Sequence, residues 1–533
     1  MRLFPMNASQ ARRRLVQGGA ALAGAALIAG CGSAYRPVVT PITPSGPQPQ
    51  PGSYAVVVSA PSVTTPGIAT IIDYSGDSVL ALAPIGPGPV TFSIDEAGAN
   101  GYTVNSDGTL SNFPITQSLQ AKNVLYSTLP STAQPVNLFT PASGLYAADL
   151  YGNVVDFFSG SPQAFRLAVG VSATPVTIMG PGTGGQRLYS INQGAVASGT
   201  ACNTAPTTAP LGSANGIELT TDTVSSTIPL GKCPVFAAES PDNKRLFVLN
   251  RGDDTITVIN AQDNTPDTCV PFQNQSGEWV TCHPVLPLSL TAVSALNAAS
   301  AGSGNPPNGT AGMTNLAGPV YAEYISALNE LVIADYDGGT ISVIDVSEDI
   351  YGNDANTYAN PTCTVAGVTS YANCGAVTGG FGTTYTIAVG QTSTPFPASV
   401  TALADGSRAY TANQGDGTEN GTVTIVNLSS HTVEKTLPVT GHPRTVVSTQ
   451  NSEQGKVYVA SPDSPYLTIV RTDLDIIDTT VLVEGNIVDV RVASQNGNPG
   501  NANTVSRTPG YGQPCYLPGA SYASSLAQCR TLP

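Results

Sequence analysis

Residues 233–260 contain three short apolar runs separated by two polar turns. The runs are PVFAAE (234–239), RLFVLN (245–250) and TITVIN (255–260), and the turns between them are SPDNK and RGDD. The runs are rich in β-branched and aromatic residues, which favours strands. The turns are rich in Asp, Asn, Pro and Gly, which accept tight-turn dihedrals. The pattern predicts antiparallel strands joined by hairpins.

The same pattern recurs along most of the chain. A central run like RLFVLN is followed by a Gly/Asp/Asn turn and another apolar run. Its other copies are GYTVN (101–105), LYAAD (145–149), LYSIN (188–192), LVIAD (331–335), AYTAN (409–413) and VYVAS (457–461). The run before each centre usually opens with proline, which suits the first residue of a strand. The openings are Gly88-Pro89, Gln134-Pro135, Thr174-Pro175, Cys233-Pro234, Gly318-Pro319, Thr394-Pro395 and His442-Pro443. A fourth, outer run follows many units.

Four strands per unit is the composition of a propeller blade, so we predict an all-β propeller. The units resemble the YVTN family of β-propeller repeats, and the resemblance covers about residues 54–494. Residues 54–86 offer three strands and 487–493 offer one, which predicts a blade shared by both ends of the ring. The repeat count is then eight. The family more often has seven blades, so seven stays open, with 87–130 as the irregular unit.

The first 30 residues have the features of an export signal. Arg12, Arg13 and Arg14 precede an apolar stretch that ends in Leu27-Ile28-Ala29-Gly30-Cys31. This ending resembles a bacterial lipobox, which implies cleavage before Cys31 and its lipidation. We therefore divide the chain into a lipoprotein signal (1–30), a Pro-rich lipidated tether (31–52), the propeller (53–494) and a Gly/Asn/Pro-rich tail (495–533). The expected location is the cell envelope, on the outer membrane or its periplasmic face.

The net charge of the chain and its distribution limit the classes of partner that we expect. The chain has a formal net charge of −15, and four of its 20 Lys and Arg residues lie in the first 30 positions. No concentrated basic surface is visible, so we expect no nucleic-acid partner. No second apolar stretch is long enough to span a bilayer, so we expect membrane contact through the lipid alone. We expect a monomer.

Apart from Cys31, eight cysteines remain, and an even number in an exported chain favours disulfides. All of them lie in insertions, joints between units or the tail, and the insertions are 194–215, 262–282 and 347–384. The simplest pairing is local. It joins Cys202 to Cys233, Cys269 to Cys282, Cys363 to Cys374, and Cys515 to Cys529. No CxxC occurs, so a metal site is not expected, and neither is a cofactor.

Few residues of the sequence suggest catalysis or ligand binding. The chain has three histidines, His283, His431 and His442, and His431 is expected in an exposed hairpin. His442, Gln134, Thr174 and Thr394 precede opening strands, where a propeller funnel can bind a ligand. We assign no catalytic residue.

Arg251-Gly252-Asp253 is expected to be a hairpin turn rather than an adhesion motif. A calcium loop beginning at Asp335 is rejected because Val346 replaces the bidentate Glu. The acidic insertion around Glu348 and Asp354 is expected to be solvated.

The sequence therefore favours a lipid-anchored, non-catalytic module that binds proteins or glycans. The alternative is an enzyme, because some relatives of this repeat resemble sugar-lactone hydrolases. A quinoprotein or haem oxidoreductase is not favoured, because CxxCH is missing and histidines are few.

Overall fold

The chain forms strands and turns throughout its described part, as a computed structural model shows. The described residues are 53–95, 97–115, 124–131, 133–141, 144–180, 186–194, 210–269, 272–273, 279–280, 282–288, 317–348, 354, 356–358, 377–391, 395–415, 417, 419–450 and 455–494. Among these residues, no helix is long and apolar enough to cross a membrane. They all belong to one compact unit, Pro44–Pro533.

Eight antiparallel blades make up the fold, and each runs from an innermost strand at the ring's centre to an outermost strand. In that order, blades 1 to 4 are β37 (Asn486–Ser494), β1 (Ser53–Ala60), β2 (Pro66–Asp73) and β3 (Val79–Pro87); β4 (Pro89–Ile94), β5 (Asn100–Asn105), β6 (Thr109–Pro114) and β7 (Leu125–Thr128); β8 (Pro135–Phe139), β9 (Leu145–Asp149), β10 (Val154–Ser159) and β11 (Ala164–Gly170); and β12 (Pro175–Met179), β13 (Arg187–Asn192), β14 (Leu211–Glu218) and β15 (Thr223–Lys232).

The remaining blades follow the same order. Blades 5 to 8 are β16 (Pro234–Glu239), β17 (Arg245–Asn250) and β18 (Thr255–Asn260), with both β19 (Thr265–Pro266) and β22 (Val285–Pro287) outermost; β23 (Pro319–Ile325), β24 (Glu330–Asp335), β25 (Thr340–Asp345) and β28 (Thr384–Ala388); β29 (Pro397–Ala402), β30 (Arg408–Asn413), β31 (Thr422–Asn427) and β32 (Thr432–Pro438); and β33 (Thr445–Ser448), β34 (Lys456–Ala460), β35 (Tyr466–Arg471) and β36 (Ile476–Leu482).

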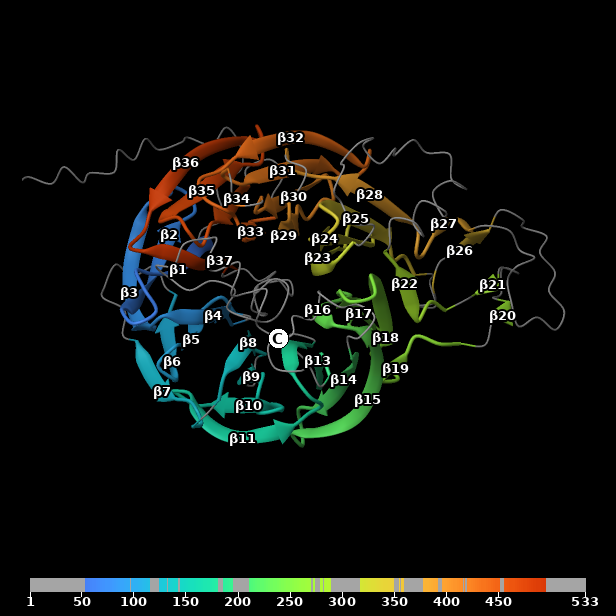
Figure 1. Cartoon of the computed structure of the whole chain (residues 1–533), viewed down its shortest axis with the longest axis horizontal. Helices are drawn as coiled ribbons and strands as arrows, with labels where there is room; N and C mark the ends of the chain where they lie inside the picture. The colour runs from blue at the N-terminus through green and yellow to red at the C-terminus, as the bar shows by residue number, and fades with distance from the viewer. Residues whose placement is uncertain are drawn as a thin grey trace, which may run out of the picture. The chain divides into compact units, whose positions relative to one another are not determined.

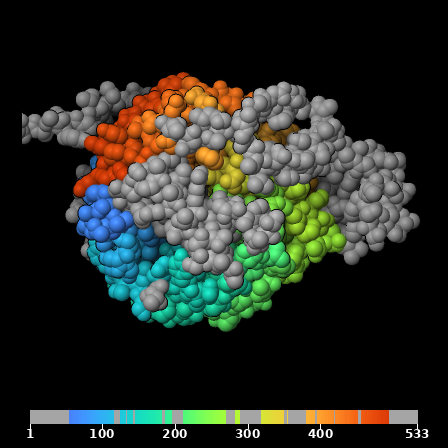
Figure 2. Space-filling model, viewed as in Figure 1, coloured from blue at the N-terminus to red at the C-terminus, as the bar shows by residue number. Residues whose placement is uncertain are grey.

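These blades form a closed ring, which confirms the predicted propeller (Figure 1). Each innermost strand contacts the innermost strands of its two neighbours, and the series returns to its start between β37 and β4. Figure 2 shows the chain colours passing around the ring from blade to blade. The count of eight is confirmed. The expectation of an irregular unit at 87–130 is wrong, because β4 to β7 form an ordinary blade whose outer strand is merely short.

Both ends of the ring meet in blade 1, as predicted. β37 pairs antiparallel with β1, and the register places Tyr54 opposite Ala493 and Val57 opposite Val490. Side chains from this blade, including Val56 and Ile71, are fully buried between its neighbours. The shared blade removes the open edges that an unclosed ring would expose.

Polar side chains link adjacent innermost strands, whose inner edges have no further strand to pair with. The Thr177 hydroxyl donates to the Val235 carbonyl at 2.9 Å. The Ser399 hydroxyl accepts from the Val446 amide at 3.0 Å and donates to the Arg444 carbonyl at 2.8 Å. Buried backbone groups require such partners. This requirement explains why buried Thr and Ser alternate with aliphatic residues in these strands.

A second recurring contact joins the end of the second strand to the third strand in several blades. The amide nitrogen of Asn250 donates to the hydroxyls of Thr255 and Thr257, at 3.1 and 2.9 Å. The same arrangement occurs in blades 2 and 7, at Asn105 and Asn413. Blade 6 has Asp335 in this position, and the Thr340 and Ser342 hydroxyls donate to its Oδ2. Asp335 is fully buried, and burial raises its pKa to about 7.

Candidate functional site

The mouth face of the ring carries the joints between blades and the turns between second and third strands. Gln134, Thr174 and His442 lie at such joints, as predicted. Their backbone amides donate to a side chain at the end of a second strand (Asp149) or in the turn that follows one (Asn153 and Asp463). Thr394 lies outside the described residues. Its binding role therefore stays a prediction, but the strand opening predicted at Thr394-Pro395 is wrong, because β29 opens at Pro397, directly after Phe396. The described contacts link none of these predicted residues to another.

His442 has a partner that the sequence did not reveal. Its Nδ1 lies 2.5 Å from Oδ2 of Asp463, while the backbone amide of His442 donates to Oδ1 of the same carboxylate at 2.8 Å. These contacts lower the pKa of Asp463, although burial opposes them. A similar backbone contact, shifted by one residue relative to the opening proline, occurs in blade 5, where the Lys232 amide donates to Asp253. Blade 8 therefore adds an imidazole to a turn contact that recurs elsewhere in the ring.

Arg251 joins blade 5 to blade 6 on this mouth face, and Tyr336 extends the contact to blade 7. Its guanidinium donates to both carboxylate oxygens of Asp337, at 2.8 and 2.9 Å, and lies 5.1 Å from the centre of the Tyr336 ring. Tyr336 in turn stacks on Phe396 and donates its hydroxyl to Gln414. The Arg251 side chain is only 2% exposed. It is committed to this contact, which agrees with the prediction of a turn rather than an adhesion motif.

Blade 5 departs most from the repeat. β19 pairs with the end of β18, and β22 pairs with its beginning, so two separate segments make up the outermost strand. Residues 267–284 form an insertion between these segments, and residues 346–383 form a second one between β25 and β28 of blade 6. We call the two insertions together the insertion lobe. Figure 1 shows its hairpins, β20 (Phe272–Gln273) with β21 (Trp279–Val280) and β26 (Asn356–Tyr358) with β27 (Val377–Gly380), beside the ring at blades 5 and 6.

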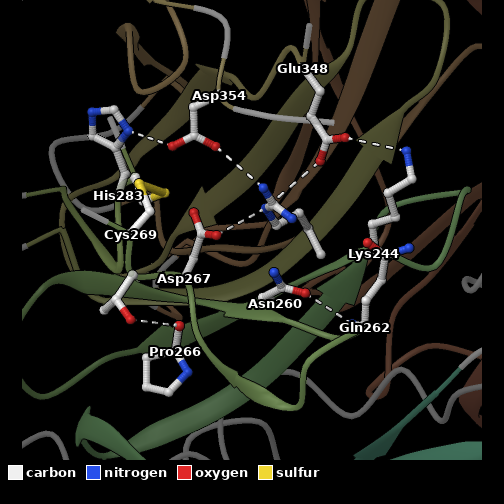
Figure 3. Close-up of polar contacts among 12 residues, drawn as sticks. Lys244, Asn260, Gln262, Pro266, Asp267, Cys269, His283, Glu348 and Asp354 are labelled. Atoms are coloured by element: carbon white, nitrogen blue, oxygen red, sulfur yellow. Dashed lines mark hydrogen bonds and ion pairs between the residues drawn. A yellow bond between two sulfur atoms is a disulfide. The ribbon is translucent and has the colours of Figure 1, made fainter. Parts of the chain in front are cut away.

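Charged side chains from both insertions meet at the base of the lobe, as Figure 3 shows. We call this set the lobe cluster; its members are Arg245, Asp267, His283, Glu348 and Asp354. Arg245 opens β17, and its side-chain nitrogens lie 3.4 Å from Asp267, 3.8 Å from Glu348 and 3.7 Å from Asp354. His283 Nδ1 lies 2.7 Å from the other oxygen of Asp354. One arginine of the ring is thus shared by carboxylates of both insertions.

The centre of the lobe cluster is buried and Glu348 and His283 are partly buried, contrary to the expectation of a solvated acidic loop. The side chains of Arg245, Asp267 and Asp354 are 5%, 3% and 0% exposed. Burial raises the pKa of Asp267, and the nearby Asp354 raises it further, while Arg245 opposes both. Burial also raises the pKa of Glu348, again against Arg245. Carboxylates removed from water need a cation nearby, and Arg245 supplies it.

An aromatic contact and a disulfide complete the base of the lobe. The His283 ring stacks on Phe381 of the second insertion, with 5.3 Å between ring centres. Cys282, its neighbour in sequence, is bonded to Cys269 across a separation of 13 residues, as predicted. Cys233 is also disulfide-bonded. Its predicted partner Cys202 lies outside the described residues, as do Cys31, Cys363, Cys374, Cys515 and Cys529, so these pairings and the lipidation stay predictions.

His431 is less exposed than expected. Its ring stacks on Tyr385 of blade 6 with 3.6 Å between ring centres, and its Nε2 lies 4.0 Å from Glu330. Burial lowers the pKa of His431. Its φ of 53° is the left-handed turn conformation that Asp222, Asn264 and Asp475 adopt at the same hairpin of other blades. Histidine tolerates this conformation better than most residues, so the turn accounts for its position.

Comparisons with known proteins reveal likeness of fold only. No protein-family model and no curated protein matches the chain. Among solved structures, AztD from Citrobacter koseri is 12% identical over 83% of this chain and 97% of its own, with a TM-score of 0.49. Sqt1 of Saccharomyces cerevisiae is 9% identical over 79% and 94%, at 0.47. The periplasmic gluconolactonase of Pseudomonas aeruginosa is 12% identical over 83% and 99%, at 0.43. Such likeness carries no argument about ligand or reaction.

Proposed function

We propose that this chain is an exported, lipid-anchored, non-catalytic binding module, and that it contacts its protein or glycan ligand through the insertion lobe. The propeller is of the YVTN type and acts as a rigid monomeric support. The ligand is not a nucleic acid. The protein is held at the cell envelope through lipid on Cys31.

One observation carries this proposal: the outer strand of blade 5 is interrupted to support the insertion lobe. The register places Ile259 opposite Pro266 and Thr257 opposite Val285, so a single residue would suffice between the two segments. The chain instead has residues 267–284 there, fixed to the second insertion by the lobe cluster. Loops held on a rigid scaffold are where binding residues concentrate.

The test removes the first insertion while restoring the strand. Residues 267–284 are replaced by one threonine, which should lie opposite Val258 and leave a continuous outer strand. We expect the variant to keep its ring, checked by circular dichroism, and to lose binding in a glycan array and in proximity labelling on the cell surface. A variant that folds and retains the full set of wild-type ligands would refute the lobe as the contact region.

Lipidation is tested separately. Cys31→Ser is expected to move the protein from the membrane fraction to the soluble fraction, because diacylation needs the thiol. Labelled palmitate should enter the wild type and not the variant. Wild-type protein that takes up no label, together with unchanged fractionation of the variant, would contradict the prediction.

A second candidate function is sugar-lactone hydrolysis, which the contact between His442 and Asp463 favours. A carboxylate bound to Nδ1 fixes the tautomer of an imidazole, as in hydrolases that use histidine as a general base. If this function is present, the wild type should hydrolyse gluconolactones and His442→Ala should lose about 10²–10⁴-fold in kcat/KM. We expect no turnover above the uncatalysed rate in either protein, and wild-type turnover abolished by His442→Ala would replace the binding proposal.

A further inference from the structure

A contact between neighbouring blades recurs in the outer part of the ring. The residue that opens the second strand of one blade contacts the turn between the third and fourth strands of the next blade. Between blades 7 and 8, the Arg408 guanidinium contacts the Asp475 carboxylate. Between blades 8 and 1, the Lys456 ammonium lies 2.6 Å from Oδ1 of Asp77. Each contact pairs a basic side chain with an acid, and such side chains ordinarily carry opposite charges at neutral pH.

Blades 6 and 7 have a different pair in these positions. Glu330 opens β24, and His431 occupies the turn of blade 7 with the left-handed φ that Asp77 and Asp475 also have. Oε1 of Glu330 lies 4.0 Å from Nε2 of His431. The acid is therefore on the strand and the base on the turn, the reverse of the other two contacts. Because an imidazole ordinarily loses its charge near pH 6.5, it is not a permanent cation for this acid.

The Glu330 carboxyl is largely buried at this contact. Its side chain is 16% exposed, and that of His431 is 21% exposed. Oε2 of Glu330 and Nε2 of His431 have no hydrogen bond within the part of the chain that the structure describes. In that part, Glu330 also forms no ion pair with Lys or Arg. A carboxylate in such a place is costly unless a cation accompanies it, so the folded chain favours the protonated acid.

The groups around the pair act in the same direction. Burial, and to a smaller extent Asp345 of β25, raises the pKa of Glu330 to about 7. Burial lowers the pKa of His431. Tyr385 of β28 stacks on the imidazole with 3.6 Å between ring centres, and Glu434 lies in β32, on the same hairpin as His431. None of these three neighbours is a cation that could hold Glu330 in its charged form.

We propose that Glu330 and His431 form a proton-operated latch between the outer parts of blades 6 and 7, closed while Glu330 holds a proton and released when it loses that proton. A carboxyl whose folded pKa is raised stabilises the closed form at low pH, and this contribution is lost as the pH rises to about 7. His431 opposes the effect below about pH 6.5, because its imidazole binds a proton more readily in the open form. The latch does not rest on the proposed function.

Release should stay local, because other contacts join the two blades closer to the centre of the ring. Oε1 of Glu323 accepts from the Ala402 amide at 3.4 Å, and the Thr424 hydroxyl accepts from the Gly390 amide at 2.9 Å. β23 and β24 also contact β29. We therefore expect movement of the turn at 428–431, which carries His431, while the ring stays closed.

The experiment measures amide hydrogen exchange of the full chain at pH 6 and pH 8, corrected for the intrinsic pH dependence of exchange. Opening of the turn at 428–431 should rise about fivefold to tenfold between the two pH values. This change follows from a Glu330 pKa of about 7 in the closed form and about 4.3 in the open form, less the opposing effect of His431. The turn at 472–475, which Arg408 contacts through Asp475, is the internal control and should change less than about twofold. Equal opening of the turn at 428–431 at both pH values would overturn the latch.

Glu330→Gln removes the titrating group and keeps the side-chain volume. Its turn at 428–431 should exchange at pH 8 as slowly as the wild-type turn does at pH 6. In wild type, the NMR signal of the His431 ring should show an inflection near pH 7 that the variant lacks, because Glu330 loses its proton beside the ring. These wild-type measurements test the latch even if the variant does not fold.

Glu434→Gln is the matched control, because it removes an acid from the same hairpin as His431. It should keep the wild-type dependence of exchange on pH. A dependence that persists in Glu330→Gln, or a wild-type His431 signal without the inflection near pH 7, would show that another group titrates there and that the latch is wrong.

Discussion

Asp335→Asn is expected to stabilise the protein, most strongly at alkaline pH. The Asp335 carboxyl is fully buried, and its pKa is raised to about 7 in the folded chain. A carboxyl with a raised folded pKa binds its proton more tightly when folded, so its contribution to stability falls as pH rises from about 4 to about 7. Above about pH 7 the folded protein bears the full free-energy cost of burying the charged carboxylate, which is at most about 4 kcal/mol. Asparagine carries no charge, so Asp335→Asn removes this cost.

The repeat also shows that asparagine fits this position. Asn250 and Asn413 occupy the same place in blades 5 and 7, and their amide groups donate to two hydroxyls of the third strand. In Asp335→Asn the amide would donate to Thr340 and Ser342, whose hydroxyls now donate to the carboxylate. The side-chain volume stays the same, so the substitution should not disturb the packing around position 335.

The measurement compares unfolding of wild type and variant at pH 5 and pH 8. We expect a gain of about 2–4 kcal/mol at pH 8 and a smaller gain at pH 5, because wild-type Asp335 is already protonated there. The matched control is Asn413→Asp, which should lose stability with the opposite pH dependence. A destabilised Asp335→Asn would show that the carboxylate has a partner that asparagine cannot replace. A gain equal at both pH values would contradict the raised pKa of Asp335.

Much of the ring was predictable because its determinants are local. Short apolar runs, turn residues and proline at strand openings specify each blade without reference to distant residues. The error at blade 7 was also local, because Thr394-Pro395 and Phe396-Pro397 offer two openings within four residues. The structure uses the second, and Phe396 has the left-handed φ found at Thr174 and Cys233, also just before proline.

Side-chain contacts between blades were harder to predict. Asp463 lies 21 residues after His442, the same spacing as Asp253 after Lys232, so a comparison of joints and turns could have paired them. No such regularity exists for the lobe cluster. Asp267, Glu348 and Asp354 belong to insertions without a repeat, and their burial follows from how two insertions pack together. From sequence they resemble ordinary acidic loop residues.

Arg245→Met is expected to loosen the insertion lobe more than the ring. The substitution keeps most of the side-chain volume but removes the guanidinium shared by Asp267, Glu348 and Asp354. Leaving buried charges without their partner typically costs about 3–5 kcal/mol. The insertions can avoid much of this cost by opening toward water. We therefore expect faster amide exchange and faster proteolysis at 282–288, and a smaller loss of global stability.

The shifted carboxyl pKa values determine whether the lobe of Arg245→Met opens more at high or at low pH. Burial already raises the pKa values of Asp267 and Glu348 against the opposing effect of Arg245, so its removal raises them further. Raised carboxyl pKa values favour the closed lobe while the groups are protonated, and this contribution is lost as pH rises through the folded values. The lobe of Arg245→Met should therefore be more open at pH 8 than at pH 5.

Lys244→Met is the matched control for Arg245→Met. Lys244 is the preceding residue, and its ammonium contacts Asp242 and Glu348 from a side chain that is 34% exposed. Exposed pairs contribute about 0–1 kcal/mol, so this variant should differ little from wild type in exchange at 282–288 at either pH. Equal effects of the two substitutions would mean that total positive charge, rather than the buried guanidinium, holds the insertions together. An Arg245→Met lobe that opens further at pH 5 than at pH 8 would contradict the assignment of the raised carboxyl pKa values to this cluster.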